Sequence, residues 1–224
     1  MKKELGRPTE EHSREAVVHG RYLLAPAAVA GPRPLLVGFH GYAEGAESQL
    51  ARLAAIPGSE GWHLAAVQGL HAFYNRRSGE VVASWMTRQN RELAIADNLR
   101  FVSGVLEELQ ARCSTSTLVL AGFSQGVAMA YRAAAFCGLP AAALVVLAAD
   151  VPPDVAAGAR PLPPVLLARG FEDYGYSAEK MGEDVATLHS LHVDVETFTF
   201  DGGHEWSPAF AAKVGEWLAP LLAG

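Results

Sequence analysis

Short, continuous runs of apolar residues alternate along the chain with segments whose apolar residues recur every three or four positions. The short runs predict buried strands at 35–39, 63–68, 116–121, 141–149 and 165–168, and an alternating segment predicts another strand at 193–200. The periodic segments predict helices at 47–56, 92–112, 125–136, 177–190 and 206–222. The other stretches predict an edge hairpin within 15–26, irregular loops at 69–82 and 151–164, and a flexible segment at 1–14. This alternation predicts one α/β domain over residues 1–224, with a mainly parallel central sheet and helices on both faces.

The composition narrows the class of protein. Hydrophobic residues make up 50% of the 224 residues and the formal net charge is −6, whereas nucleic-acid-binding domains usually carry a basic patch. No stretch offers the roughly 18 uncharged apolar residues of a membrane span, and the polar N-terminus lacks the apolar core of a signal peptide. Cys113 and Cys137 have no metal-type or C-x-x-C spacing, so we expect buried thiols. We therefore expect a cytoplasmic protein that does not bind nucleic acid.

The segment Gly122-Phe123-Ser124-Gln125-Gly126 fits the G-x-S-x-G pattern of a nucleophilic serine. The pattern also arises by chance in glycine-rich chains, so its context decides its meaning. Here a predicted strand precedes it and a predicted helix follows it, which gives the sharp turn that such a serine occupies. The N-terminus of that helix would also stabilise negative charge beside the serine. We predict that Ser124 is a catalytic nucleophile.

A serine hydroxyl needs a base to take up its proton, and α/β hydrolases order their triad as serine, acid, histidine. Three histidines follow Ser124 in the sequence. His189 lies in a predicted helix and His192 begins a predicted strand, but His204 lies in a glycine-rich turn between the last strand and the last helix. We predict His204 as the base.

The acid that orients the histidine must lie in a loop that follows a strand between these two residues. Asp173 and Glu172 both lie in the loop after the predicted strand at 165–168, and Asp150 at the end of the preceding strand is a weaker candidate. We prefer Asp173, but position alone separates it poorly from Glu172.

The oxyanion of a tetrahedral intermediate needs two backbone N–H donors. One should belong to Gln125, the residue after the nucleophile. The loop after an early strand should supply the other, and Gly38-Phe39-His40-Gly41-Tyr42 fills that place. We predict the N–H of Tyr42 as the second donor.

From about residue 34 onward, the chain resembles the phospholipase/carboxylesterase family of α/β hydrolases, which includes bacterial carboxylesterases and acyl-protein thioesterases. The matching segments are His40-Gly41, Ser84-Trp85, Gly122-Phe123-Ser124-Gln125-Gly126, Arg169-Gly170-Phe171-Glu172-Asp173 and Gly203-His204. The resemblance implies an α/β-hydrolase fold without a large cap domain, and a small-molecule ester or thioester substrate. It implies no metal and no organic cofactor. It also selects Asp173 over Glu172, because the family's acid is the aspartate of a Gly-x-x-Asp segment.

Two segments that border the family's acyl pocket depart from its pattern. Residues 42–45 read Tyr-Ala-Glu-Gly where the family commonly has Leu-Gly-Asp, and residues 85–87 read Trp-Met-Thr where it has Trp-Phe-Asp. The triad therefore transfers, but the substrate preference does not. The candidate pocket residues are His40, Phe73, Trp85 and Arg88, and Arg76 and Arg77 are further candidates for contact with an anionic substrate group. An acyltransferase, a peptidase and a non-catalytic binding protein on the same fold stay open as alternatives.

Overall fold

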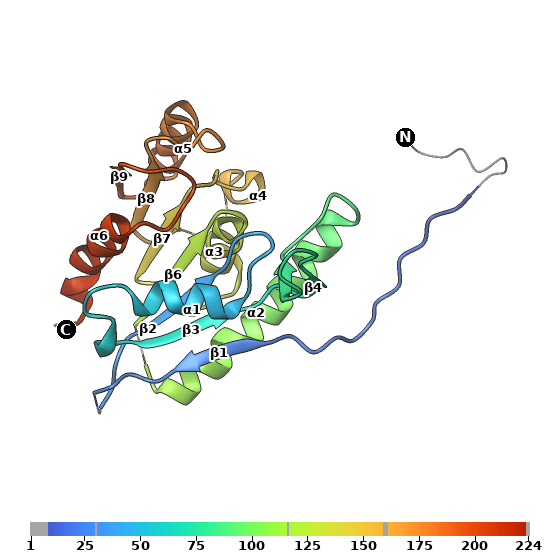
Figure 1. Ribbon diagram of the computed structural model, residues 1–224, viewed down its shortest axis with the longest axis horizontal. Coiled ribbons are helices and arrows are strands. Elements are labelled where there is room, and N and C mark those ends of the chain that lie inside the picture. Colours follow the sequence, from blue (N-terminus) through green and yellow to red (C-terminus); the bar gives the residue numbers. More distant parts are fainter. Residues whose placement is uncertain (1–8, 30, 116, 159–160, 223–224) are drawn as a thin grey trace.

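A computed structural model describes residues 9–29, 31–115, 117–158 and 161–222. Its centre is a seven-stranded sheet in the order β1-β3-β2-β6-β7-β8-β9, in which only β1 runs antiparallel to its neighbour (Figure 1). These strands are β1 (Tyr22–Ala25), β2 (Leu35–Phe39), β3 (His63–Val67), β6 (Leu118–Phe123), β7 (Ala143–Leu147), β8 (Val165–Gly170) and β9 (Val195–Phe200). A separate antiparallel hairpin consists of β4 (His71–Tyr74) and β5 (Val81–Ser84). The helices are α1 (Ala46–Ala54), α2 (Arg91–Cys113), α3 (Gln125–Phe136), α4 (Pro153–Ala156), α5 (Ala178–Ser190) and α6 (Pro208–Leu218), with short 3-10 turns at Ser59–Gly61 and Ala219–Leu222.

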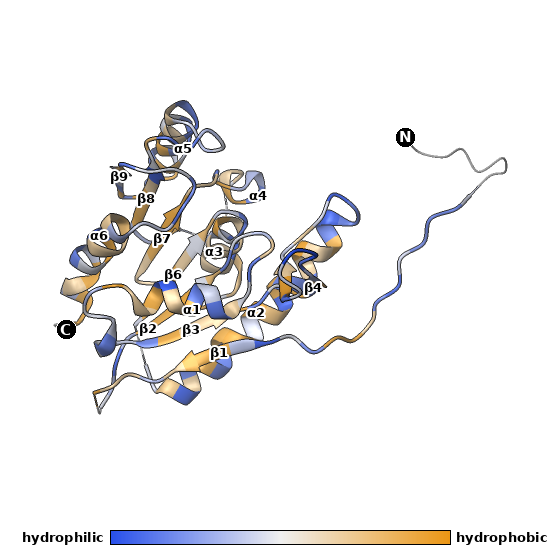
Figure 2. Ribbon diagram, viewed as in Figure 1, coloured by the Kyte–Doolittle hydropathy of each residue, from blue (hydrophilic) through white to orange (hydrophobic). Residues whose placement is uncertain are grey.

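Apolar side chains cover both faces of the sheet, because successive residues of a strand point to opposite faces. Leu118 and Leu120 belong to the core under α2, α3 and α5, whereas Val119 belongs to the core under α1 and α6. The strands β6 and β7 are accordingly buried along their whole length, while the helices contain both polar and apolar residues (Figure 2). This arrangement confirms the predicted mainly parallel sheet with helices on both faces.

The register of the sheet brings the loops that carry the predicted site to one edge. Phe39 at the end of β2 pairs with Gly122 of β6, and Gly170 at the end of β8 pairs with Phe200 at the end of β9. Since these strands are parallel, the loops that follow them all begin at their carboxyl ends. Ligand sites of open α/β sheets lie at this edge.

Several predicted elements need correction. The segment 15–26 contains the single edge strand β1 instead of a hairpin, and the segment 69–82, predicted to be irregular, contains β4 and the first half of β5. The loop at 151–164 includes the short helix α4, and the last helix begins at Pro208, where the hydroxyl of Ser207 accepts a hydrogen bond from the N–H of Phe210 at 3.1 Å. Ser116, the predicted start of β6, lies outside the described residues.

The N-terminal residues and the two cysteines agree with a compact α/β domain that has an extended N-terminal segment. Residues 1–8 of the segment predicted to be flexible lie outside the described residues, and residues 9–14 are exposed and extend away from the sheet (Figure 1). Cys113 and Cys137 are buried free thiols, as predicted. Across the described ranges, no helix is long and apolar enough to cross a membrane. The same residues contain no cluster of three or more histidine, cysteine or acidic side chains suited to a metal ion.

Candidate active site

Ser124 occupies the sharp turn between β6 and α3. Its backbone dihedrals are φ 51° and ψ −123°, and its N–H donates to the carbonyl of Leu147 at 2.9 Å. Two glycines let this turn fit against its surroundings. A Cβ on Gly122 would lie 2.7 Å from the Gly126 carbonyl oxygen, and a Cβ on Gly126 would lie 2.1 Å from the Phe39 carbonyl oxygen. A positive φ at a non-glycine residue is strained, and this strain is typical of the turns that present nucleophilic serines.

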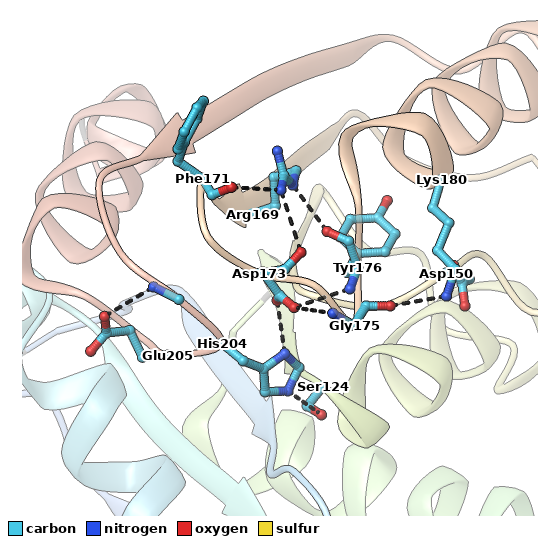
Figure 3. Close-up of polar contacts among 11 residues, drawn as sticks. Ser124, Asp150, Arg169, Phe171, Asp173, Gly175, Tyr176, Lys180, His204 and Glu205 are labelled. Carbon is cyan, nitrogen blue, oxygen red and sulfur yellow. Dashed lines mark hydrogen bonds and ion pairs between the residues drawn. The ribbon is translucent and has the colours of Figure 1, made fainter.

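Ser124, His204 and Asp173 come from three loops and form one hydrogen-bonded chain (Figure 3). His204 Nε2 lies 2.8 Å from Ser124 Oγ, and His204 Nδ1 lies 2.8 Å from Asp173 Oδ2. Since a carboxylate can only accept, Nδ1 carries the proton of the neutral imidazole and Nε2 is free to accept the serine proton. The arrangement therefore has the polarity that a general base requires.

The alternative candidates from the sequence lie away from this chain of hydrogen bonds. Glu172 and Asp150 are both exposed, and neither side chain contacts His204. His189 and His192 are exposed at the C-terminal end of α5. Of the three carboxylates considered, the one at hydrogen-bond distance from the histidine is that of Asp173, which is 2% exposed.

Asp173 is held in place from two sides. Its Oδ1 accepts hydrogen bonds from the backbone N–H groups of Gly175 at 2.9 Å and Tyr176 at 3.0 Å, which leaves Oδ2 for the histidine. The buried guanidinium of Arg169 donates to the carbonyl oxygens of Tyr176 at 2.9 Å and Phe171 at 3.0 Å (Figure 3). Arg169 belongs to a segment that matches the family, but the sequence alone predicts no role for it. Its signal is a basic residue at the end of an otherwise apolar strand.

The loops that carry the acid and the histidine touch through their backbones. A Cβ on Gly170, the last residue of β8, would lie 2.2 Å from the carbonyl oxygen of Gly203 and 2.5 Å from that of Gly202. The N–H of Glu172 also donates to the Gly202 carbonyl at 2.8 Å. Only glycine permits so close an approach, so these contacts fix the spacing between the two loops.

The two predicted oxyanion donors have no hydrogen-bond partner among the described residues. Within the described part of the chain, the backbone N–H groups of Tyr42 and Gln125 donate to no other group. The loop that contains Tyr42 is tied to β5, because the N–H of Ala43 donates to the Ala83 carbonyl at 3.0 Å and the N–H of Ala83 donates to the Glu44 carbonyl at 2.7 Å. Donors that are held in place and unpaired are what stabilisation of an oxyanion requires.

An ion pair between Arg52 and Glu44, which was not predicted from the sequence, stabilises the loop that contains Tyr42. The guanidinium of Arg52 donates to the carboxylate of Glu44 at 2.6 Å and 2.5 Å, and the N–H of Gly41 donates to that carboxylate at 2.8 Å. Burial raises the pKa of Glu44, but the hydrogen bonds and charge of Arg52 outweigh it, so the pKa lies below its ordinary value. Arg52 also lies 4.4 Å from the ring centroid of Phe123, which lies 5.2 Å from that of His204.

His40 and Trp85, two of the four predicted pocket residues, lie beneath the site instead of lining it. Both are completely buried, and the indole N–H of Trp85 donates to the His40 carbonyl at 2.8 Å. The side chain of Gln125 holds the backbone at Trp85 and Met86 in place. Its oxygen accepts from the N–H of Trp85 at 3.0 Å, and its nitrogen donates to the Met86 carbonyl at 3.1 Å. Sequence position placed these residues correctly near the site, but burial gives them a supporting role.

The surroundings of His40 predict its protonation state. Its Nε2 accepts from the N–H of Gly69 at 3.0 Å and its Nδ1 lies 2.7 Å from the Gly41 carbonyl oxygen, so Nδ1 carries the proton. Burial lowers its pKa from the ordinary value of 6.5.

At pH 6.5, ¹⁵N chemical shifts of labelled histidine should show His40 mainly as the neutral Nδ1–H tautomer, with a His40→Gln spectrum for assignment. A ring that is half protonated at that pH would contradict this prediction.

Two cavities meet at Ser124. The first, which we name the arginine cavity, has a volume of about 390 Å³. It is lined by Met86, Thr87, Arg88, Arg91, Ser124, Gln125, Ala128, Arg132, Ala149, Asp150, Val151, Pro152 and Pro153. The second, named the Trp206 cavity, has a volume of about 520 Å³. It is lined by Gly41, Tyr42, Glu44, Arg52, Phe123, Ser124, His204, Glu205 and Trp206.

These cavities separate the remaining predicted pocket residues. Arg88 lines the arginine cavity. Phe73 lines neither cavity and packs on Tyr42 at a centroid distance of 5.8 Å, while Arg76 and Arg77 are exposed between β4 and β5. Arg132 was not predicted to be a cavity residue. The sequence feature that could have indicated it is that it is the one charged residue in α3.

Comparison with known proteins adds to this geometry. No protein-family model and no curated protein matches the sequence. Among solved structures, esterase PE8 is similar with a TM-score of 0.74 at 21% identity, covering 91% of this chain and 99% of that chain. The Bacillus cereus carboxylesterase gives 0.71 at 16% identity, covering 90% and 94% of the two chains, and Zea mays acyl-protein thioesterase 2 gives 0.67 at 17% identity, covering 91% and 100%. The protein therefore has the α/β-hydrolase fold, with no large cap domain in its described residues.

Proposed function

We propose that this protein is a serine hydrolase of the phospholipase/carboxylesterase family that cleaves carboxylic esters or thioesters. The observation that carries the proposal is the hydrogen-bonded chain from Ser124 through His204 to Asp173, beside two unpaired backbone donors. The similar structures named as esterases, a carboxylesterase and an acyl-protein thioesterase support the same reaction class.

In the first half of the reaction, Ser124 Oγ attacks the carbonyl carbon of the substrate while His204 Nε2 takes up the hydroxyl proton. The carbonyl oxygen becomes an oxyanion, which the N–H groups of Tyr42 and Gln125 stabilise. The bond to the leaving group then breaks, and His204 gives its proton to the departing oxygen or sulfur. The products are an acyl-enzyme on Ser124 and a free alcohol or thiol.

In the second half, a water molecule attacks the acyl carbon and gives a proton to His204. The bond between the acyl carbon and Ser124 Oγ breaks, and the proton returns to that oxygen. Throughout, the carboxylate of Asp173 stabilises the imidazolium form of His204 without taking its proton. The net reaction consumes one water and releases the carboxylic acid.

The alternatives differ from this proposal in one measurable step. An acyltransferase would pass the acyl group to an alcohol in preference to water, and a peptidase would turn over amides. A non-catalytic binding protein would have an unreactive serine, but the complete hydrogen-bonded chain favours an activated one. Turnover of matched ester and amide substrates, with and without an acceptor alcohol, separates the first two.

A fluorophosphonate probe tests the proposal directly, because it reacts with activated serines. Intact-mass measurement should show one adduct on the native chain, none on Ser124→Ala, and one on Ser190→Ala, which removes an exposed serine at the C-terminal end of α5. A folded native chain without an adduct would contradict the proposal and favour the binding-protein alternative.

A further inference from the structure

The arginine cavity carries positive charge beside the nucleophile. Arg88, Arg91 and Arg132 line it together with one acidic residue, Asp150, and with Ser124 itself. These side chains come from the segment before α2, from the start of α2 and from the middle of α3. Two separate parts of the chain, residues 88–91 and α3, therefore bring the same charge to one cavity.

Arg132 is the buried member of this group. It is 1% exposed, and its Nε and Nη2 donate to the carboxylate of Asp154 at 2.7 Å and 2.8 Å. Its Nη1 is buried and has no hydrogen-bond partner. A buried N–H of a charged group is costly to leave unpaired. Arg132 lines the arginine cavity, so a ligand there would lie beside a guanidinium whose hydrogen-bonding capacity is not fully used.

The other charges of the cavity do not cancel this excess. Asp154 is paired with Arg132, and the carboxylate of Asp150 lies 3.9 Å from the ammonium of Lys180. The side chains of Arg88 and Arg91 form no ion pair with any described residue. With Asp154 counted against Arg132 and Asp150 against Lys180, the two guanidinium charges of Arg88 and Arg91 are in excess at the exposed part of the cavity, although the charge of Arg91 also acts on Asp154.

The position of His204 decides which half of a substrate the arginine cavity receives. His204 must give its proton to the leaving group, so the alcohol or thiol lies next to its Nε2. His204 lines the Trp206 cavity and does not line the arginine cavity, whereas Ser124 lines both. The leaving group therefore occupies the Trp206 cavity, and the acyl group extends into the arginine cavity.

We propose that the arginine cavity binds an acyl group that ends in a carboxylate, so that the substrates are monoesters or monothioesters of short dicarboxylic acids. Arg88 and Arg91 hold the carboxylate, with the buried positive charge of Arg132 behind them. A guanidinium matches the planar carboxylate with two parallel hydrogen bonds. The apolar walls at Met86, Ala128 and Val151 suit the intervening methylene groups, and the volume of about 390 Å³ limits their number. This assignment rests on the proposed hydrolase function.

Paired substrates test the assignment during turnover. Monoethyl glutarate and ethyl pentanoate have acyl chains of equal carbon number and differ in the terminal carboxylate. The ratio of their kcat/KM values, measured by acid release, should favour monoethyl glutarate in the native chain. It should fall by about tenfold in the double variant Arg88→Gln/Arg91→Gln. Arg77→Gln, which removes an exposed charge that lines neither cavity, should leave the ratio unchanged. A ratio that is equal in all three proteins would overturn the assignment.

Direct binding separates a failure of this assignment from a failure of the hydrolase proposal. Calorimetric titration of Ser124→Ala with monoethyl glutarate requires no turnover. The carboxylate site is supported if monoethyl glutarate binds, ethyl pentanoate does not, and the two arginine substitutions weaken the binding of monoethyl glutarate. This result holds even if the fluorophosphonate probe finds no reactive serine. If the probe labels Ser124 but monoethyl glutarate binds no better than ethyl pentanoate, the hydrolase proposal stands and the carboxylate site is wrong.

Discussion

The Asp173→Asn variant is expected to hydrolyse esters with a kcat about 10⁴-fold below that of the native chain, while its fold is retained. The two backbone donors at Gly175 and Tyr176 will orient the new amide so that its oxygen replaces Oδ1. Its NH₂ group then faces His204 Nδ1, which must become the acceptor. The proton moves to Nε2, and a protonated Nε2 cannot accept from the hydroxyl of Ser124.

Glu172→Gln is the matched control, because it removes the neighbouring carboxylate that position in the sequence separates poorly from Asp173. This side chain is exposed, so kcat should stay within about twofold of the native value. Thermal unfolding of both variants shows whether the fold is intact. If Glu172→Gln lost activity and Asp173→Asn kept it, the assignment of the acid would be reversed.

The Gly126→Ala variant is expected to lose both activity and stability. The added Cβ would lie 2.1 Å from the Phe39 carbonyl oxygen and 2.6 Å from the His40 carbonyl oxygen, so α3 and the end of β2 must move apart. These two segments lead to Gln125 and Tyr42, the two proposed oxyanion donors. We expect kcat to fall by about 10²–10³-fold and the free energy of unfolding to fall by about 1–3 kcal/mol.

Gly182→Ala makes the same chemical change where there is room for it. Gly182 lies in α5, and a Cβ there would meet no atom within 4 Å. Because alanine favours helix over glycine, stability should rise by up to about 1 kcal/mol and kcat should not change. Denaturant unfolding and steady-state kinetics on both variants measure the contrast. Native activity in Gly126→Ala would show that the oxyanion donors tolerate this displacement.

The parts of the molecule that the sequence predicted well are those that local chemistry dictates. Continuous apolar runs such as 143–147 can only be buried strands in this context, and the strand-turn-helix order around Ser124 places it at the sheet edge. His204, chosen for its glycine-rich loop, lies 2.8 Å from Ser124 Oγ, and its role as the base belongs to the proposed function. These features depend on residues that are near one another in the chain.

The parts that the sequence did not predict depend on contacts between distant residues. Every residue of β4 is exposed, so no apolar alternation marked this strand, and it forms by pairing with β5. The position of Trp85 near the site was correct, but only the packed structure shows that it is covered. Arg132 is surrounded by apolar residues in the sequence of α3, and its ion pair with Asp154 of α4 is visible only in the folded structure.

The backbone contact of Gly170 with Gly202 and Gly203 has a consequence for how this protein can change. It makes the distance between acid and base a property of the main chain, so the neighbouring side chains are free to vary. Phe171 and Tyr174 are 71% and 93% exposed on the acid loop. A mutant library confined to these two positions would alter the exposed surface of the acid loop and leave the backbone contact in place. The surface of this loop and the spacing of the acid and the histidine can therefore be changed independently in the laboratory.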